Sequence, residues 1–284
     1  MPKTKTETVL YFLEKSREFL QKKGIPSARL DAEVILADIL NLQRIQLYSH
    51  FDMPVSMQQQ QLYRERIVAR STFMPVSYIT HKKDFYNDTF YVNESVLIPR
   101  PETEELVEWV LHDNQPDMLY ALDLCCGSGC IGISLKKERP AWQMAYSDIS
   151  REALAITRKN HQSILGEAAG EFIHSDLFAA IAAEQTFDTI ISNPPYIPVV
   201  EKAGIMKDVL FEPEIALFVN DEKTFFEKLF SGAYAHLHEN GRLYMEINPG
   251  SLSALQEWGN AAGFREFVVK QDLSGKDRMI RLTK

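Results

Sequence analysis

The run Asn193-Pro194-Pro195-Tyr196 combines residue types that suit chemistry on a nitrogen atom. It follows the apolar run 187–191, which predicts a buried strand. Two consecutive prolines lack the N–H groups that a helix or a sheet needs, so the run predicts a stiff loop at the C-terminal end of that strand. The Asn193 side-chain oxygen and the Pro194 carbonyl can accept both hydrogens of a planar NH2 group and hold its nitrogen in line with an electrophile.

Tyr196 has two interpretations. Its ring lies over the planar nitrogen group and helps to exclude water, or it fills the edge of the sheet as an ordinary aromatic side chain. The pattern provides no general base, and none is needed if the nitrogen loses its proton only after alkylation. We therefore predict Asn193, Pro194, Pro195 and Tyr196 as the catalytic residues.

A second stretch, Asp123-Leu124-Cys125-Cys126-Gly127-Ser128-Gly129, connects a predicted strand to a predicted helix. Glycines there allow the backbone to approach a ligand at the N-terminus of the helix, whose free N–H groups favour negative charge. The signal is weak alone, because glycines also serve simple tight turns. The spacing also differs from that of dinucleotide-binding enzymes, whose glycine loop begins directly after the strand.

Carboxylates follow the next two predicted strands and strengthen this interpretation. Asp148 lies about 20 residues after the glycines, where it can accept both hydroxyls of a ribose. The alternative is an N-terminal helix cap, a role that Ser150 can fill. Asp176 and Leu177 place a carboxylate beside an apolar group, which suits an adenine ring and its amino group. The predicted adenosine site comprises Cys125, Cys126, Gly127, Ser128, Gly129, Asp148, Asp176, Leu177 and Asn193.

These residues require an alternating framework of helices and strands. Helix patterns cover 103–113, 129–138, 150–161, 223–237 and 251–261, and strand patterns cover 119–124, 143–147, 171–175, 187–192 and 241–247. Two closing strands lie near 264–270 and 277–283. The alternation predicts an α/β fold, with a mostly parallel Rossmann-like sheet, helices on both faces and an antiparallel hairpin at one edge.

The N-terminal part has a different pattern. Residues 6–75 predict helices, the first ended by Gly24, the second capped by Ser27 and the third beginning after Ser56. Short β-rich pieces at 77–80, 84–86 and 90–92, with a turn at Asn87-Asp88, predict a hairpin. We predict three parts: a helical substrate-recognition domain at 1–75, a β-hairpin linker at 76–98 and a catalytic domain at 99–284.

Charge and cysteine content narrow the function. The chain has a net charge of -8, but residues 1–75 carry eleven basic against eight acidic residues, or +3, which leaves -11 for the rest. An acidic catalytic part is a poor match for duplex DNA. The three cysteines are crowded together without metal-site spacing, so we expect neither a disulfide framework nor a metal. No apolar run suggests a membrane span or a signal peptide, and we expect a cytoplasmic protein.

The glycine loop, the two aspartates and the Asn-Pro-Pro-Tyr run resemble the motif set of S-adenosylmethionine-dependent methyltransferases that act on amide or amino nitrogen. Within that class, the string from Val96 to Glu104, Val-Leu-Ile-Pro-Arg-Pro-Glu-Thr-Glu, and the helical N-terminal part resemble the release-factor glutamine methyltransferases, the PrmC/HemK group. The likeness runs from about Leu30 to the C-terminus. Two departures are Cys125, where the family usually has glycine, and Asn248-Pro249-Gly250 after the strand that ends near 247.

This resemblance implies that S-adenosylmethionine is the methyl donor and that class-1 peptide-chain release factors are the partners. The reaction would convert the glutamine of their Gly-Gly-Gln motif into N5-methylglutamine, on a monomeric enzyme that binds neither DNA nor membranes. Arg100, Glu102 and Thr103 would border the methionine end of the cofactor, or Thr103 would cap its helix. The alternatives are adenine-N6 methylation of DNA, glutamine methylation of a ribosomal protein, and a non-enzymatic module that binds the cofactor.

Overall fold

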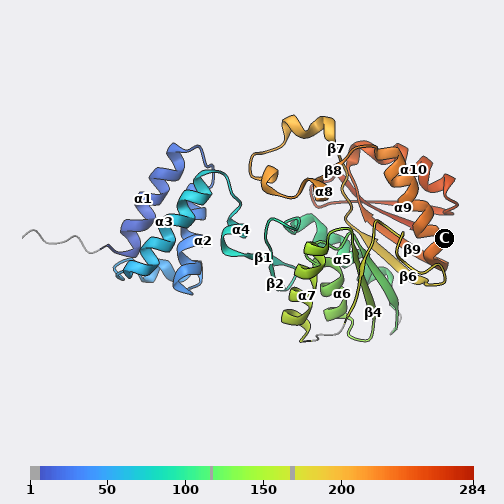
Figure 1. Cartoon of the computed structure of the whole chain (residues 1–284), viewed down its shortest axis with the longest axis horizontal. Coiled ribbons are helices and arrows are strands. Elements are labelled where there is room, and N and C mark those ends of the chain that lie inside the picture. The colour runs from blue at the N-terminus through green and yellow to red at the C-terminus, as the bar shows by residue number, and fades with distance from the viewer. Residues whose placement is uncertain (1–6, 116–117, 167–169) are drawn as a thin grey trace, which may run out of the picture. The chain divides into compact units, whose positions relative to one another are not determined.

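The computed structural model describes residues 7–115, 118–166 and 170–284. They form two compact units, and Figure 1 labels many of their elements. The first unit contains the described residues up to His81 together with Met206–Phe211, and the second contains those in Lys82–Ile205 and Glu212–Lys284. Residues 1–6 of the predicted helical domain lie outside the described residues.

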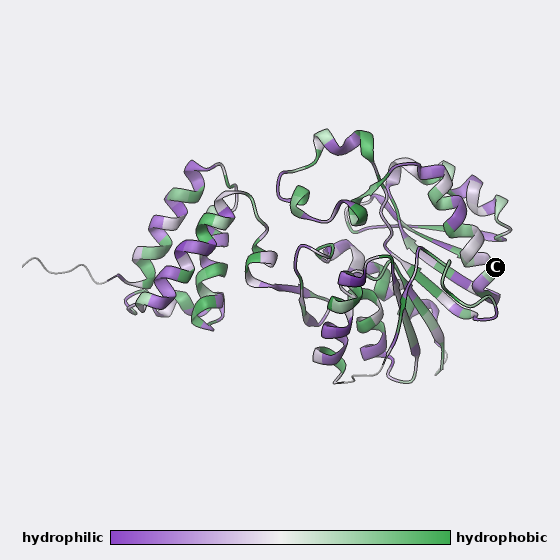
Figure 2. Cartoon of the chain, in the orientation of Figure 1, coloured by the Kyte–Doolittle hydropathy of each residue, from purple (hydrophilic) through white to green (hydrophobic). Residues whose placement is uncertain are grey.

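The first unit is helical, as predicted. Its elements are α1 (Val9–Lys22), α2 (Ala28–Leu40), the 3-10 helix η1 (Arg44–Ser49), α3 (Met57–Ser71) and α4 (Val76–Thr80). Apolar and polar residues alternate around these helices (Figure 2), and apolar ones such as Phe12, Ile35 and Tyr63 form the core of the unit. Ser56 caps α3 through a hydrogen bond from the Gln59 N–H. Ser27 precedes α2 as predicted but makes no side-chain cap bond.

The extended conformation predicted for residues 77–80 is wrong, because they lie in α4. Pro75 precedes this helix with a φ of -58°, which suits the start of a helical turn. The Thr80 hydroxyl donates to the carbonyl of Val76 at 3.0 Å within the turn. A short β-branched segment favours a strand by composition alone, and here the preceding proline and burial of Tyr78 and Ile79 outweigh that preference.

The predicted hairpin is confirmed between β1 (Lys82–Phe85) and β2 (Asp88–Tyr91), which pair antiparallel. The turn between them places Tyr86 at a φ of 56°. Phe85 and Phe90 are buried in the core of the second unit, so the hairpin is part of that unit.

The second unit contains a seven-stranded sheet of order β10-β11-β9-β6-β3-β4-β5. Its strands are β3 (Tyr120–Leu124), β4 (Gln143–Asp148), β5 (Glu171–His174), β6 (Phe187–Ser192), β9 (Leu237–Glu246), β10 (Glu266–Gln271) and β11 (Asp277–Thr283). Strands β5, β4, β3, β6 and β9 run parallel, and β11 and β10 form an antiparallel edge. The predicted mostly parallel sheet with a closing hairpin is therefore confirmed.

Helices cover both faces of the sheet (Figure 1). One face packs against α5 (Pro101–Asp113), α6 (Cys130–Glu138) and α7 (Arg151–Leu165), and the other against α9 (Glu222–His236) and α10 (Leu252–Ala261). Successive strand residues alternate between these two cores, as Ala145 and Tyr146 do in β4. None of the described helices is long and apolar enough to cross a membrane.

The sequence patterns missed the short elements between β6 and α9. They are β7 (Ile197–Pro198), η2 (Val199–Gly204), η3 (Val209–Phe211), α8 (Glu214–Leu217) and β8 (Phe218–Val219), with η4 (Pro249–Ser251) later in the chain. Each is too short to produce a periodic pattern. In the sheet order, β4 and β6 lie on opposite sides of β3, so the loops after β3 and β6 diverge at a topological switch point, where α/β sheets bind ligands.

Candidate active site

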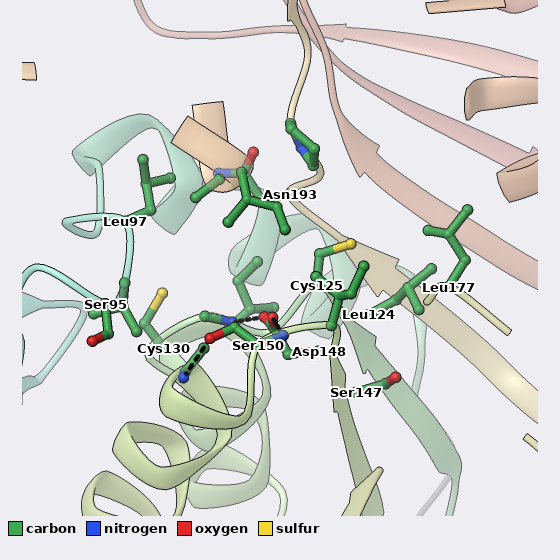
Figure 3. Close-up of a pocket in the computed structure, with 18 of the residues that line it drawn as sticks. Ser95, Leu97, Leu124, Cys125, Cys130, Ser147, Asp148, Ser150, Leu177 and Asn193 are labelled. Atoms are coloured by element: carbon green, nitrogen blue, oxygen red, sulfur yellow. Dashed lines mark hydrogen bonds between the residues drawn. The ribbon is translucent and has the colours of Figure 1, made fainter. Parts of the chain in front are cut away.

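A pocket of about 970 Å³, including its open mouth, lies at the C-terminal edge of the parallel strands (Figure 3). Its walls come from the segment before α5, the glycine loop after β3, the ends of β4, β5 and β6, and α8 and α9. The predicted residues that line it are Cys125, Gly127, Asp148, Asp176, Leu177, Asn193 and Pro195. One pocket thus brings together groups from the predicted adenosine and catalytic sets.

The glycine loop requires left-handed backbone at three positions. Cys125, Gly127 and Gly129 have φ values of 59°, 55° and 78°. A Cβ at Gly129 would lie 2.6 Å from the Thr157 methyl group, so that glycine is needed for close packing. Within the part of the chain that the structure describes, a Cβ at Gly127 would meet no atom within 4 Å, so the space beside it is open to a ligand. The loop therefore has one glycine for packing and one for access.

Helix α7 fixes the glycine loop from behind. The Thr157 hydroxyl donates to the Gly127 carbonyl at 2.8 Å. The Asn160 amide donates to the carbonyls of Ser128 at 2.9 Å and Tyr91 at 3.0 Å, and its oxygen accepts the Tyr91 N–H at 2.8 Å. Asn160 is only 2% exposed. The sequence analysis missed both residues, although polar residues three apart on the buried face of a helix are a usable signal.

Asp148 points its carboxylate at the loop. Oδ2 accepts the Gly127 N–H at 2.9 Å, and Oδ1 accepts the Ser150 N–H at 2.8 Å. Ser150 caps α7 through the Ala153 N–H, so the helix-cap alternative for Asp148 is wrong. Burial raises the pKa of Asp148, although the backbone N–H groups partly offset that effect. Figure 3 shows the carboxylate among the residues that line the pocket.

The remaining predicted residues of the adenosine set differ in their exposure. Asp176 is exposed at the pocket, and Leu177 is buried with a φ of 49°. Cys126 and Ser128 are buried and do not line the pocket, so their side chains serve the packing of the loop.

The three free thiols differ in their access to the pocket. Cys125 and Cys130 line the pocket, whereas Cys126 is buried beside Thr157. Burial raises the pKa of all three thiols, to about 12 for Cys130, so they remain neutral near physiological pH. The positive φ at Cys125 is a physical reason why glycine suits this position.

Asn193 is held by a network from two other elements. Its amide nitrogen donates to Oε2 of Glu246 at 3.1 Å and to the Thr103 hydroxyl at 3.3 Å. The Thr103 hydroxyl itself donates to Oε2 of Glu246 at 2.6 Å. No donor among the described residues reaches the Asn193 side-chain oxygen, so this acceptor is left available in the pocket wall.

Tyr196 is fixed by the same carboxylate. Its hydroxyl donates to Oε1 of Glu246 at 3.0 Å, and its ring packs against the apolar core beneath α9 and α10. Burial raises the pKa of Tyr196 and the neighbouring Glu246 charge raises it further, so the hydroxyl stays protonated. Pro195 lines the pocket, whereas the adjoining Pro194 and Tyr196 side chains do not.

Glu246 is the main site residue that the sequence analysis missed. It ends β9 and is 2% exposed. Burial raises its pKa, and the hydrogen bonds from Thr103 and Tyr196 and the charge of Arg278 oppose that effect. A lone carboxylate inside the apolar run of this strand was a usable signal, because an isolated buried charge requires partners.

The segment before α5 is tied to the loop that follows the Asn-Pro-Pro-Tyr run. Glu212 accepts the Ile98 N–H at 3.1 Å and the Arg100 guanidinium at 2.6 Å. Arg100 occupies the N-cap position of α5, and the Thr103 hydroxyl donates to Glu246, so Thr103 is not a helix cap. Arg100 and Thr103 line the pocket, whereas the exposed Glu102 does not. No cluster of three or more possible metal ligands occurs among the residues that the structure describes.

Two family models match this chain: the PrmC N-terminal domain at residues 12–80 and the methyltransferase small domain at residues 106–212. The release factor glutamine methyltransferase of Leptospira interrogans is 51% identical over 282 residues, which cover 98% of this chain and 99% of that protein. The fold is shared with a methyltransferase from Pyrococcus furiosus, with a TM-score of 0.52 at 16% identity over 81% of this chain and 99% of that one. It is also shared with the 16S rRNA N2 G1207 methyltransferase of T. thermophilus, solved with AdoMet and guanosine, with a TM-score of 0.52 at 19% identity over 72% and 49%.

Proposed function

Because the chain belongs to the release factor glutamine methyltransferase family, we propose that it methylates the glutamine of the Gly-Gly-Gln motif in class-1 peptide-chain release factors. The methyl group passes from S-adenosylmethionine to the side-chain amide nitrogen and gives N5-methylglutamine. The observation that carries this proposal is the free oxygen of Asn193 in the wall of the pocket, with the amide nitrogen held behind it by Glu246 and Thr103.

The residues of the pocket fit S-adenosylmethionine. Asp148 keeps lone pairs beyond those that accept the two backbone N–H groups, and these can accept the ribose hydroxyls. Leu177 and Phe225 offer apolar surface for the adenine, and the exposed Asp176 can accept from its amino group. The open space beside Gly127 admits a ligand close to the backbone. When bound, the cofactor supplies a methyl group on a sulfonium, which is already a strong electrophile.

The residues of this chain must orient the glutamine amide nitrogen of the substrate, which is a poor nucleophile. The lone pair of a glutamine amide nitrogen is shared with its carbonyl, so attack requires a fixed orientation. The Asn193 oxygen and the Pro194 carbonyl each accept one amide hydrogen, and the two prolines keep these acceptors rigid. Tyr196 supports this clamp from behind, because its ring packs against the core and its hydroxyl donates to Glu246. The amide proton becomes acidic after alkylation, so no general base is required before the transfer.

We assign recognition of the release factor to the helical domain predicted at 1–75, joined through 76–98 to the catalytic domain at 99–284. The net charges of +3 for residues 1–75 and -11 for the remainder support separate roles, because the two parts favour different partner surfaces. We further propose that the enzyme acts as a monomer in the cytoplasm, where release factors work and free cysteines persist.

The test is incubation of the enzyme and labelled S-adenosylmethionine with a release factor, its tip Gln→Ala variant, ribosomal proteins or a DNA duplex. Fragment mass spectrometry should locate one added CH2 group on the tip glutamine and none on the tip variant. Methylation of DNA or of a ribosomal protein in preference to the release factor would overturn the proposal. Cofactor binding without transfer to any of these substrates would instead support a binding module.

A further inference from the structure

Three donors converge on the Glu246 carboxylate. The Thr103 hydroxyl and the Asn193 amide nitrogen lie 2.6 and 3.1 Å from Oε2, and the Tyr196 hydroxyl lies 3.0 Å from Oε1. An asparagine nitrogen only donates, and an ionised carboxylate only accepts. The ionised form of Glu246 therefore satisfies all three groups at once, and at 2% exposure little of this arrangement is accessible to water.

The same carboxylate selects one of two orientations of the Asn193 carboxamide. Its oxygen and nitrogen are similar in size, so a half turn about the last side-chain bond exchanges them without a steric cost. After that turn, two oxygens would face each other across the 3.1 Å now spanned by the hydrogen bond to Oε2. The turned form would also present a donor to an amide N–H, where an acceptor is required.

We infer that Glu246 is a positioning residue of the methyl transfer, which keeps the Asn193 oxygen directed at the reacting nitrogen and increases its negative charge. This inference rests on the proposed function, because it assumes a substrate nitrogen that carries hydrogen. It extends that function because Glu246, which lies outside the Asn-Pro-Pro-Tyr run, determines how strongly the Asn193 oxygen accepts a hydrogen bond from the substrate amide.

The electrostatic effect of Glu246 depends on the positive charge that develops on the substrate amide nitrogen during methyl transfer. As the methyl group moves, positive charge passes to the amide nitrogen, and the N–H groups become more acidic until a proton leaves to solvent. A hydrogen bond from the Asn193 amide to a carboxylate polarises the carboxamide, so its oxygen becomes a stronger acceptor for those N–H groups. The effect is larger in the transition state than in the ground state, and it therefore raises kcat.

Charged and titratable groups face Glu246 from each surrounding element. Arg278 of β11 favours the ionised form, and Glu102 of α5 opposes it. The Cys130 thiol of α6 and the Tyr196 hydroxyl are neutral, because the pKa of each is raised. Burial raises the pKa of Glu246 itself. The orienting charge is therefore lost at a higher pH than it would be for an ordinary glutamate, and kcat should fall on the acid side with the titration of this group.

The direct test compares Glu246→Gln with the wild-type enzyme, using S-adenosylmethionine and the release factor at saturating concentrations. We expect kcat to fall by roughly 10- to 100-fold, as for other residues that orient a catalytic group, with less than about a 2-fold change in KM for the cofactor. The acid limb of the kcat profile should disappear in the variant. Thr103→Val, which removes a hydroxyl but leaves the carboxylate, should keep the acid limb.

A second readout needs no turnover. In enzyme labelled with 15N-asparagine, the Asn193 side-chain NH2 should exchange slowly with solvent because it is bonded to Glu246, and exchange should quicken in Glu246→Gln. Asp113→Asn is the matched control. This substitution removes the charge of a carboxylate that accepts hydrogen bonds from Arg281 and from Tyr244 of β9, the strand that carries Glu246. It should lower Tm without altering kcat or the exchange of the Asn193 NH2.

The outcomes distinguish a failure of the proposed function from a failure of the positioning role of Glu246. No methylation of the release factor by the wild-type enzyme would end the proposed function. Wild-type methylation together with an unchanged kcat, acid limb and Asn193 exchange in folded Glu246→Gln would overturn the positioning role alone. If Glu246→Gln does not fold, the wild-type enzyme alone decides, through the protection of the Asn193 NH2 against exchange relative to an exposed asparagine NH2 at the same pH. Protection that is high at neutral pH and falls on acidification supports the role, and protection independent of pH overturns it.

Discussion

The amide nitrogen of Asn193 lies 3.1 Å from the carboxylate of Glu246, although 53 residues separate them in the chain. Sheet register explains this proximity. Ser192 at the end of β6 pairs with Met245 of the parallel strand β9, so the residues that follow each of them emerge side by side. The Asn-Pro-Pro-Tyr loop is therefore placed against a buried carboxylate by the two strands that carry them, rather than by the loop alone.

Removing the Asn193 carboxamide should strongly impair transfer. Asn193→Ala deletes one of the two acceptors for the substrate amide hydrogens, and we expect a loss of about 3 to 4 kcal/mol in transition-state stabilisation, measured as kcat/KM for the release factor. Cofactor affinity, measured by calorimetry, should change much less. Normal turnover by this variant would show that the assigned role is wrong.

Much of the framework could be predicted because its patterns are long. Strand 187–192 was predicted with the bounds that β6 has, and the alternation from Glu102 onward predicted the sheet type and its antiparallel edge. The glycine loop and Asp148 were also predictable, because consecutive parallel strands bring their C-terminal ends to one edge. Local sequence patterns, together with the rule that parallel strands end at one edge of their sheet, were therefore sufficient to predict these features.

The parts that were missed depend on contacts between distant elements. Glu246 was missed because it serves the site only where β9 lies beside β6, and its contact with Thr103 was missed because it requires α5 to pack across β9. Periodicity reveals neither contact. Asn160 joins the hairpin to the glycine loop over 69 and 32 residues. Residues 77–80 were assigned wrongly because a five-residue helix such as α4 gives no periodic signal.

Gly127 should be essential for cofactor binding and not for folding. Gly127→Ala places a methyl group in the open space of the pocket, at a φ of 55°. Gly166→Ala is the matched control, with a φ of 73° and no atom of the described residues within 4 Å of its Cβ, but at the C-cap of α7. Both should lose about 1 kcal/mol of stability by urea unfolding. Only Gly127→Ala should weaken S-adenosylmethionine binding, by roughly 10-fold or more; equal affinities for the two variants would contradict the proposed ligand position.

Asp123 should make the enzyme less stable as the pH rises. Burial raises the pKa of this fully buried carboxyl to about 7, against an ordinary value of 3.8, although it accepts the Gly132 N–H. Between these values the folded state holds a proton that the unfolded state has released, so the free energy of unfolding falls as pH rises from about 4 to 7 and stays reduced above that.

Asp123→Asn keeps an acceptor for Gly132 but cannot ionise. The fall in Tm between mildly acidic and mildly alkaline buffer should therefore be smaller in this variant, by at least about 2 °C, in scanning calorimetry. Asp148 and Glu246, whose pKa values burial also raises, retain a share of the same trend in both proteins. A wild-type Tm that rises through this range in parallel with that of the variant would exclude the assigned ionisation.

Glu212 should control the order of the segment before α5. Its side chain is 2% exposed and accepts from the Ile98 N–H and the Arg100 guanidinium, next to Pro99 in the pocket wall. Glu212→Gln keeps an oxygen for one donor and removes the charge. Arg100 is partly exposed, so solvent screens much of the ion pair, and the cost should be about 1 to 2 kcal/mol of stability from the weakened buried hydrogen bonds.

A matched exposed pair lies on the same loop, between Lys202 and Glu214, whose side chains are 43% and 72% exposed. Glu214→Gln should change stability by less than about 0.5 kcal/mol, because screened surface pairs contribute little. The two variants are compared by their free energies of unfolding in urea and by their cofactor affinities in calorimetry. Glu212→Gln should lose stability and cofactor affinity together, since Pro99 and Arg100 line the pocket that the buried carboxylate holds in place. Equal behaviour of the two variants would mean that Glu212 does not order the pocket wall.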